Sequence, residues 1–298
     1  MCDVQKIDER ILKCYNAIAS FDDNLRLRYK YSMKIRWEDL VKQNIKNFKK
    51  YTFLLEQLVK KEIKLKYRSS VLGVFWTLLE PILTMLVLTL VFESMFRKGI
   101  EYIPVYILSG RLLYTFFSNS TKAATKSIRK NGAMIKKVYV PKYIYPLSAI
   151  IANYIMFLIS LVVLVITALF LRMPITWHIV EIIIPLALLF VMCLGVGLIL
   201  ATMSVFFRDL EYLWGVALML IMYTCAIFYH PNSLIDAGKG WVLDLNPLYA
   251  IIANFRNSLY GLPQDTYYLV FAAIFSFASL FIGLFAFYKN QDKFILNI

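Results

Sequence analysis

The chain has 298 residues, of which 60% are hydrophobic and 16% aromatic, and its formal charge is +14 at pH 7. This composition excludes a soluble domain of the same length and predicts a polytopic, all-α membrane protein. In a soluble chain the positive charge would suggest a nucleic-acid partner. Here the Lys and Arg residues gather beside apolar segments, so no nucleic acid is expected.

Residues 1–50 are polar and basic and form a cytoplasmic N-terminal extension ahead of the first apolar run. Their helical periodicity is weak, and it does not decide between a helix pair and a partly disordered segment. In residues 51–69 the pattern is firmer, since Leu54, Leu58 and Ile63 fall on one helical face and lysines on the other. This amphipathic helix is expected to lie in the cytoplasmic membrane interface. A soluble helix packed on a partner is the alternative.

Six apolar runs follow, within a predicted transmembrane domain that covers residues 70–290. A bilayer core requires about 20 helical residues, and the runs cover about 71–96, 103–121, 146–171, 179–207, 213–229 and 267–288. Between the last two runs, the apolar patches on either side of Asn246-Pro247 are too short to span the bilayer. They predict two external re-entrant helices, because non-helical backbone at membrane depth must be buried in protein.

A few residues inside the runs break the apolar pattern. Glu80 precedes the helix-kinking Pro81, and an acidic residue in a span usually faces a bundle interior or water. Arg111 either snorkels to the outer surface or lines a polar cavity, and snorkelling is the favoured interpretation. Gly195 and Gly197 in the fourth run indicate close contact with another helix.

The distribution of Lys and Arg predicts the orientation of the spans. Seven of these residues lie between positions 122 and 142, in the connection between the second and third runs, and 17 precede position 69. The loops of the opposite side together contain five. Cytoplasmic loops carry the excess of Lys and Arg, so both termini are predicted to be cytoplasmic.

The cysteines and histidines do not suggest a disulfide or a metal site. The four cysteines show no CxxC or paired spacing, and Cys193 and Cys225 fall within apolar runs, so reduced packing residues are expected. His178 and His230 have no ligand-like neighbours, so no metal is expected on this chain.

The stretch 64–81, which reads KLKYRSSVLGVFWTLLEP, turns from basic to apolar within two serines. It resembles the first span of the membrane subunit of bacterial type-2 ATP-binding-cassette exporters for cell-surface polysaccharides, O-antigen and teichoic acids. The matching residues are Lys66, Tyr67, Arg68, Ser70, Leu72, Gly73, Trp76 and Pro81. Position 80 is commonly an amide in that family and position 114 is typically Trp, whereas this chain has Glu80 and Tyr114. The resemblance covers residues 64–288.

Further motifs extend the resemblance. In the family, the connection 122–141 carries a short coupling helix that docks into a groove on the ATPase, and the match here comprises Asn131, Met134, Ile135, Lys136, Lys137 and Pro141. An apolar pair ringed by lysines suits insertion into a partner groove. A merely positive cytoplasmic loop would explain the lysines but not the apolar pair. Arg208-Asp209 and Asn246-Pro247 match two other family motifs, and Arg208 and Asp209 are expected to form an interfacial ion pair.

The resemblance implies a homodimer with two separate ATPase subunits, which would bind the ATP and magnesium. No cofactor is expected on this chain, because its 11 glycines form no G-x-x-x-x-G-K-[ST] nucleotide loop. The first and fifth spans of the two copies would line a central channel. Aromatic rings suit the C–H faces of sugars, and the candidates are Phe75, Trp76, Tyr114, Phe116, Phe117, Tyr223, Phe228 and Tyr229. Interfacial belts and lipid-facing packing are the competing interpretation of these residues.

Lys64, Lys66 and Arg68 lie where the diphosphate of a lipid-linked polymer would meet the membrane. Nonspecific attraction to anionic lipid is the simpler explanation of the same charges.

The predicted function is the transmembrane subunit of an ATP-driven exporter of a lipid-linked polysaccharide or teichoic acid, in the bacterial cytoplasmic membrane. The alternatives are an exporter of a lipid or drug and a membrane enzyme acting on lipid-linked sugars. Such an enzyme would need clustered Asp, Glu or His at one membrane face. Asp209 and Glu211 are instead expected on the side opposite Asp236 and Asp244, so no catalytic residue is predicted.

Overall fold

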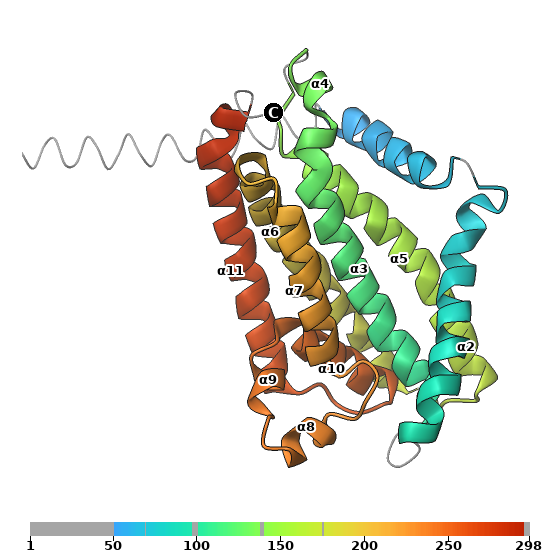
Figure 1. Ribbon diagram of the computed structural model, residues 1–298. Helices are drawn as coiled ribbons and strands as arrows, with labels where there is room; N and C mark the ends of the chain where they lie inside the picture. The colour runs from blue at the N-terminus through green and yellow to red at the C-terminus, as the bar shows by residue number, and fades with distance from the viewer. Residues whose placement is uncertain (1–50, 69, 97–100, 138–139, 175, 295–298) are drawn as a thin grey trace, which may run out of the picture. The chain divides into compact units, whose positions relative to one another are not determined.

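The computed structural model describes residues 51–68, 70–96, 101–137, 140–174 and 176–294 (Figure 1). The chain divides into two units, residues 1–54 and 55–298, and the second contains the predicted membrane domain. In the described ranges every regular element is a helix, which confirms the predicted all-α fold class. The predicted extension, residues 1–50, lies outside the described residues.

Six long helices make up most of the described part of the second unit. They are α2 (Trp76–Phe96), α3 (Ile103–Lys130), α5 (Ile144–Phe170), α6 (Ile183–Phe206), α7 (Leu210–Thr224) and α11 (Thr266–Asn290). A further helix covers residues 51–67, where the interface helix is predicted. The shorter elements are η1 (Gly73–Phe75), α4 (Gly132–Ile135), η2 (Trp177–Ile182), α8 (Asn232–Asp236), α9 (Trp241–Asp244), α10 (Pro247–Leu259) and η3 (Gln291–Lys293).

Among the described residues, four helices are long and apolar enough to cross a bilayer. They cover Gly73–Phe92, Ile144–Phe170, Trp177–Phe206 and Thr266–Lys293, at the predicted first, third, fourth and sixth runs. At the second run, α3 is long enough but carries polar residues along one face. At the fifth run, α7 has 15 residues, fewer than a bilayer core requires.

α3 is the central helix of the second unit. Figure 1 shows it between α5 and α2 on one side and α7 on the other, and it also packs on α6. Its core residues Val105, Leu113 and Ile128 are completely buried. The aromatic ring of Phe116 stacks on Phe157 of α5, with 4.9 Å between the ring centroids.

The connection that follows the second predicted run, which ends at residue 121, begins as a continuation of a helix. α3 continues to Lys130, so only the segment from Asn131 to Tyr143 connects it to α5. Ala, Lys and Arg are strong helix formers and are frequent in this extension. Ala124 and Ile128 are also fully buried, so packing against neighbouring helices stabilises the additional turns.

Within the predicted fifth span, 213–229, the helix α7 ends at Thr224. The chain then turns at Ala226, whose φ of 46° is unusual for a residue other than glycine. Arg256 of α10 donates hydrogen bonds to the carbonyl oxygens of Ala226 (2.9 Å) and Ile227 (3.3 Å). Buried hydrogen bonds from a charged group therefore hold the end of α7 in place.

Of the two short apolar patches before the last run, one forms a substantial helix and the other a single turn. α10 has 13 residues and α9 has four. The Asn246 side chain caps α10 by accepting from the backbone N–H groups of Leu248 (3.0 Å) and Tyr249 (3.3 Å). Pro247 follows at the first helical position, where its missing N–H costs nothing. The Asn-Pro motif is therefore the start signal of α10.

Glycines allow α6 and α11 to approach closely. A Cβ atom at Gly195 would lie 2.3 Å from the backbone nitrogen of Leu280, and one at Gly283 would lie 2.6 Å from the carbonyl oxygen of Gly195. At Gly197 a Cβ atom would lie 2.8 Å from Cδ1 of Ile150. These distances confirm the close helix contacts predicted for Gly195 and Gly197.

We expect Gly195→Ala to lower the thermal stability of the purified protein in detergent, because the new methyl group meets backbone atoms that cannot rotate away. Overpacking of this kind costs about 1–3 kcal/mol. Gly215→Ala on α7 is the matched control, since nothing lies within 4 Å of its Cβ position. Equal melting temperatures for the two variants would contradict the close approach of α6 and α11.

Candidate functional site

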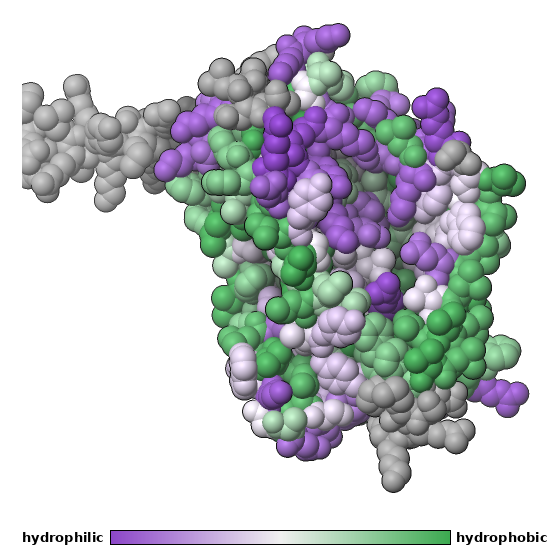
Figure 2. All heavy atoms as spheres, viewed as in Figure 1, coloured by the Kyte–Doolittle hydropathy of each residue, from purple (hydrophilic) through white to green (hydrophobic). Residues whose placement is uncertain are grey.

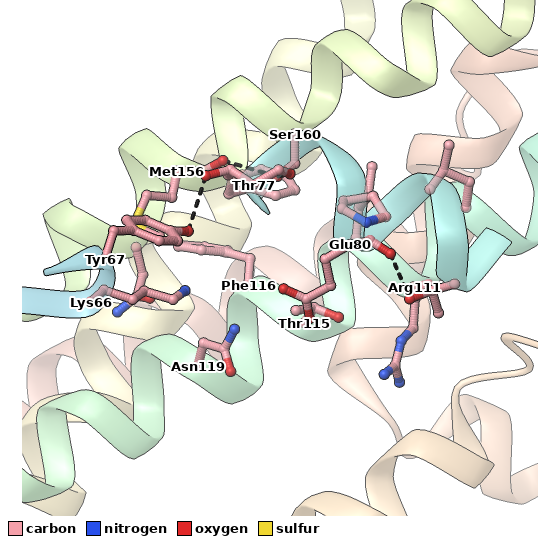
Figure 3. Close-up of a pocket in the computed structure, with 16 residues that line it drawn as sticks. Lys66, Tyr67, Thr77, Glu80, Arg111, Thr115, Phe116, Asn119, Met156 and Ser160 are labelled. Carbon is pink, nitrogen blue, oxygen red and sulfur yellow. Dashed lines mark hydrogen bonds between the residues drawn. The ribbon is translucent and has the colours of Figure 1, made fainter. Parts of the chain in front are cut away.

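A polar cavity of about 70 Å³ lies between α2, α3, α5 and the end of the 51–67 helix (Figure 3). Its polar lining residues are Lys66, Tyr67, Thr77, Glu80, Thr84, Arg111, Thr115, Asn119, Asn153 and Ser160. Phe116, Met156 and Phe157 contribute apolar surface. Polar and charged groups among membrane helices are costly to bury, so they usually mark a functional site. The cavity is therefore the candidate functional site.

Pro81 helps to shape the cavity wall. Proline has no N–H, so it cannot make the helical hydrogen bond to the carbonyl oxygen of Thr77, four residues earlier. The hydroxyl of Ser160 on α5 donates to that carbonyl oxygen at 3.0 Å. It also lies 3.0 Å from the carbonyl oxygen of Met156. A side chain of a neighbouring helix thus satisfies the backbone group that Pro81 leaves free, and links α2 to α5.

Residues of the first-span motif form the turn between the 51–67 helix and α2. The hydroxyls of Tyr67 and Thr77 are 3.0 Å apart and share a hydrogen bond (Figure 3). The backbone N–H of Gly73 donates to the side chain of Ser70 at 3.2 Å. Gly73 has a φ of 52°, which glycine adopts without steric cost. These contacts explain why Tyr67, Ser70 and Gly73 occur together in the sequence.

Three charged residues lie along the cavity, with Glu80 between Lys66 and Arg111 (Figure 3). Lys66 is exposed at the end of the 51–67 helix, but the surrounding atoms remove part of the hydration of its ammonium group and lower its pKa. The charge of Glu80 opposes that shift. Nη1 of Arg111 lies 3.4 Å from the sulfur of Met222 on α7, which is a weak acceptor. Of the two predicted positions for Arg111, the structure shows the one that lines a cavity.

The predicted aromatic residues divide into packing residues and exposed ones. Tyr114 and Phe117 are buried, the first with its hydroxyl donating to the carbonyl oxygen of Leu218 (2.8 Å) and the second against Trp214. Phe116 lines the cavity. Phe228 stacks on Phe92, and Tyr229 is half-buried. Phe75, Trp76 and Tyr223 are exposed.

The predicted coupling segment directly follows α3. Asn131 is buried, donates to the carbonyl oxygen of Ser127 (2.9 Å) and accepts from Lys61 (3.3 Å). α4 contains Met134 and Ile135, but Ile135 is buried against this chain. Of the apolar pair, only Met134 stays partly exposed, next to the exposed Lys136 and Lys137.

Two acidic residues missed in the sequence hold this end of α3. Glu62 of the 51–67 helix pairs with Lys130 at 2.8 Å. Glu211 of α7 pairs with Arg129 and, at 3.3 Å, with Lys126. The position of Glu211 in the first turn of α7, where acidic residues are favoured, is the signal that could have identified it.

The expected ion pair between Arg208 and Asp209 does not form, although both residues are described. They lie in the short connection between α6, which ends at Phe206, and α7, which begins at Leu210. The carbonyl oxygen of Asp209 accepts backbone hydrogen bonds from Tyr212 (3.0 Å) and Leu213 (3.2 Å). The motif therefore marks the helix boundary, while Glu211 makes the ion pairs.

Comparison with known proteins identifies the family. The model of the family described as ABC-2 type transporter matches residues 54–260. This chain belongs to the ABC-2 type transporter family. Membership in this family and the four apolar helices make the chain a multi-pass membrane protein.

Curated relatives of this ABC-2 transporter chain match it over most of their length. The O-antigen export system permease protein RfbA of Myxococcus xanthus is 28% identical over 233 residues, which are 77% of this chain and 90% of the relative. RfbA of Klebsiella pneumoniae is 27% identical over 244 residues, which are 81% of this chain and 93% of the relative. The polysialic acid transport protein KpsM of Escherichia coli is 24% identical over 255 residues, which are 82% of this chain and 95% of the relative. The family predicted from the sequence motifs is thereby confirmed.

The hydrogen bond that replaces the one lost at Pro81 can be tested with a double-mutant cycle. We expect Ser160→Ala to destabilise the protein by about 1–2 kcal/mol, because the carbonyl of Thr77 loses its partner. In a Pro81→Ala background the cost should be smaller, since the introduced alanine supplies an N–H to that carbonyl. Thermal unfolding in detergent measures both costs.

Ser148→Ala is the control for this cycle, because the Ser148 hydroxyl donates within α5, to the carbonyl oxygen of Tyr145 at 2.9 Å. The destabilisation caused by Ser148→Ala should be the same whether residue 81 is proline or alanine. An equal cost of Ser160→Ala in both backgrounds would show that Ser160 does not act through Thr77.

Proposed function

We propose that this chain is the membrane-spanning subunit of an ATP-driven exporter that moves a lipid-linked cell-surface polysaccharide across the cytoplasmic membrane. One observation carries this conclusion: relatives matched over 90% or more of their length are named as O-antigen export permeases and a polysialic acid transport protein. These names favour a polysaccharide over a teichoic acid, a lipid or a drug. The polar cavity among apolar helices supports transport of a hydrophilic substrate.

The working unit is a homodimer with two ATPase subunits, which bind the ATP and magnesium. Only 6% of the apolar window of the first span is buried, compared with 44% in α5. α2 and α7 both expose large apolar side chains, among them Leu86, Leu90, Val216 and Leu220. In a bilayer such faces contact lipid or a second copy, and one copy alone rarely encloses a wide path. These two helices are therefore the natural dimer interface and channel border.

In this assembly α3 and α7 complete six spans, with both termini in the cytoplasm. A 15-residue helix rises about 22 Å, which is less than the roughly 30 Å of a bilayer core. The buried turn after Thr224 and the underlying α10 supply the remainder of the crossing, since non-helical backbone must be enclosed by protein at that depth. The cluster of Lys and Arg between positions 122 and 142 supports a cytoplasmic location for α4.

The ATPase acts through the segment around α4. Met134, with Lys136 and Lys137 beside it, offers a partly exposed apolar side chain and two cations to a groove on the partner. Asn131 and the buried Ile135 hold this segment to the chain. Movement of α4 would reach α3 directly, and the ion pairs of Glu62 and Glu211 would carry it to the neighbouring helices.

The lipid-linked end of the polymer enters beside the 51–67 helix. Lys64 and Arg68 are exposed there, and Lys66 reaches the cavity wall. A diphosphate is the group on a lipid-linked polymer that would contact such cations at the membrane surface.

The ATPase interaction provides the test of the proposed function. In a deletion strain, the wild-type chain should restore the surface polysaccharide and co-purify with an ATP-binding-cassette ATPase. The triple variant Met134→Asp, Lys136→Glu, Lys137→Glu should lose both, because it places negative charge at the docking site. Lys239→Glu, on the opposite side, is the control. A wild-type chain that restores no polymer, or a triple variant that retains the ATPase, would contradict the proposal.

Neutralising the entry cations tests the role of the lipid diphosphate. Each juxtamembrane cation contributes about 1 kcal/mol, so the triple variant Lys64→Gln, Lys66→Gln, Arg68→Gln should lower export by about tenfold or more. Export is measured as surface polymer per inserted exporter.

Lys42, Lys46 and Lys49 of the N-terminal extension provide the matched control, neutralised in the same way. Equal losses from both triple variants would assign the effect to general attraction of anionic lipid.

A further inference from the structure

α3 is buried on every side except one. Between Val105 and Ile128 the residues that are not buried are Arg111, Thr115, Asn119, Lys122, Ala123 and Lys126. We refer to Arg111, Thr115, Asn119, Lys122 and Lys126 as the α3 stripe. Their spacing of three and four residues places them along one face of the helix. A central membrane helix thus exposes a face on which five of the six residues are polar, and the sixth is the small Ala123.

Most members of the α3 stripe have no polar partner among the described residues. In the part of the chain that the structure describes, Thr115, Asn119 and Lys122 make no side-chain hydrogen bond or ion pair. The guanidinium of Arg111 contacts the thioether sulfur of Met222 and lies 5.9 Å from the ring centroid of Tyr114. Lys126 is the exception, since it pairs with Glu211. Polar side chains at membrane depth need water or a polar ligand if the protein offers nothing. The stripe therefore faces an aqueous space rather than lipid.

The position of the stripe agrees with this conclusion. Arg111, Thr115 and Asn119 line the cavity beside α2, and Lys122 and Lys126 continue the same face toward α4. Figure 2 shows hydrophilic surface running from the α4 end of the second unit into the hollow between α7 and α2. Arg111 and Lys122 are 11 positions apart, a rise of about 16 Å. The part of the stripe between Arg111 and Lys122 therefore extends over about half the thickness of a bilayer core.

The charge of this path is mainly positive. The stripe supplies Arg111, Lys122 and Lys126, and the cavity adds Lys66. The carboxylate of Glu80 lines the cavity, and that of Glu211 pairs with Lys126. In water a pair of charges 4 Å apart interacts by about 1 kcal/mol. Such contacts can favour one class of polymer while remaining weak enough for the chain to slide past.

On the basis of the proposed export function, we propose that the α3 stripe lines the translocation path and selects an anionic polysaccharide, one with carboxylate or phosphodiester groups along its chain. A neutral polymer could use the hydroxyl and amide groups of Thr115 and Asn119. The spaced cations would not attract it. The anionic groups of an acidic polymer, in contrast, would pass from one cationic side chain to the next as the polymer moves. The stripe thus narrows the substrate class of the exporter.

Thiol accessibility tests whether the path is aqueous. In the complete exporter, with Cys2 and Cys14 replaced by Ser, Thr115→Cys and Asn119→Cys should react with hydrophilic methanethiosulfonate reagents. The native Cys193 and Cys225 are buried and remain. Ser120→Cys is the buried control on the same helix, and Val165→Cys on α5 is the lipid-facing control, and both should be unreactive. Stripe cysteines that fail to react, for instance because a second copy covers them, would overturn the proposal.

Charge selectivity tests the substrate class. At Asn119→Cys the anionic sulfonatoethyl reagent should react at least about tenfold faster than the cationic trimethylammonium reagent, relative to the exposed reference Ser233→Cys. The ratio should fall toward the reference value in the Arg111→Gln, Lys122→Gln background and at high salt, because the field of the cations is removed or screened. α2,8-Linked oligosialic acid should protect the cysteine, and a malto-oligosaccharide of equal length should not.

The outcomes separate this inference from the proposed function. The preference for anions would be overturned if Asn119→Cys reacted with the same ratio of anionic to cationic reagent rates as Ser233→Cys. Equal protection by both oligosaccharides would also overturn it. Neither result would contradict the proposed export function. Loss of surface polymer on deletion of the chain is measured independently, without any stripe variant. If the wild-type chain restores no polymer, the proposed function fails, whatever the cysteines report.

Discussion

The membrane domain depends on the pairing of backbone polar groups where water is scarce. Two sites show the same solution with different chemistry. At Pro81 a carbonyl freed by the missing N–H accepts from Ser160 of α5, and at the end of α7 the carbonyls of Ala226 and Ile227 accept from Arg256. In both places a side chain from another helix replaces the hydrogen bonds that a continuous helix would have made. The interruptions thereby become contacts that fix neighbouring helices.

α3 unites the parts of the molecule that transport requires. Its buried faces contact α5, α6 and α7, and its remaining face borders the polar cavity. Its last turn is tied by Lys130 to Glu62 and by Arg129 to Glu211, immediately before α4. A force applied at α4 therefore acts on a rigid rod whose other end lies beside the cavity. No hinge is needed between the site where energy would enter and the site where substrate would pass.

Much of the fold could be predicted from the sequence, because apolar runs of bilayer length and the family motifs are local signals. The all-α class, the Asn246-Pro247 helix start and the close contact at Gly195 belong to this group. Tertiary packing decided what local signals could not. The burial of Ile128 extends α3 through a segment that reads as a polar loop, and the burial of Ile135 removes it from the apolar pair expected at the surface. The ion pairs of Glu211 depend on how α7 lies against α3, which no spacing reveals.

The two ends of the second unit are fastened by different forces. Near α4 the contacts are ion pairs between partly exposed side chains, which dissolved ions weaken. Near α10 the buried Arg256 is held by carbonyl oxygens at 2.9–3.3 Å and lies 3.5 Å from the ring centroid of Tyr106. Arginine keeps its charge at any pH a cell meets, and carbonyl groups do not titrate. The α10 end would therefore keep its conformation when the pH or salt concentration of the surroundings changes. The α4 end, where an ATPase would act, is the one that can move.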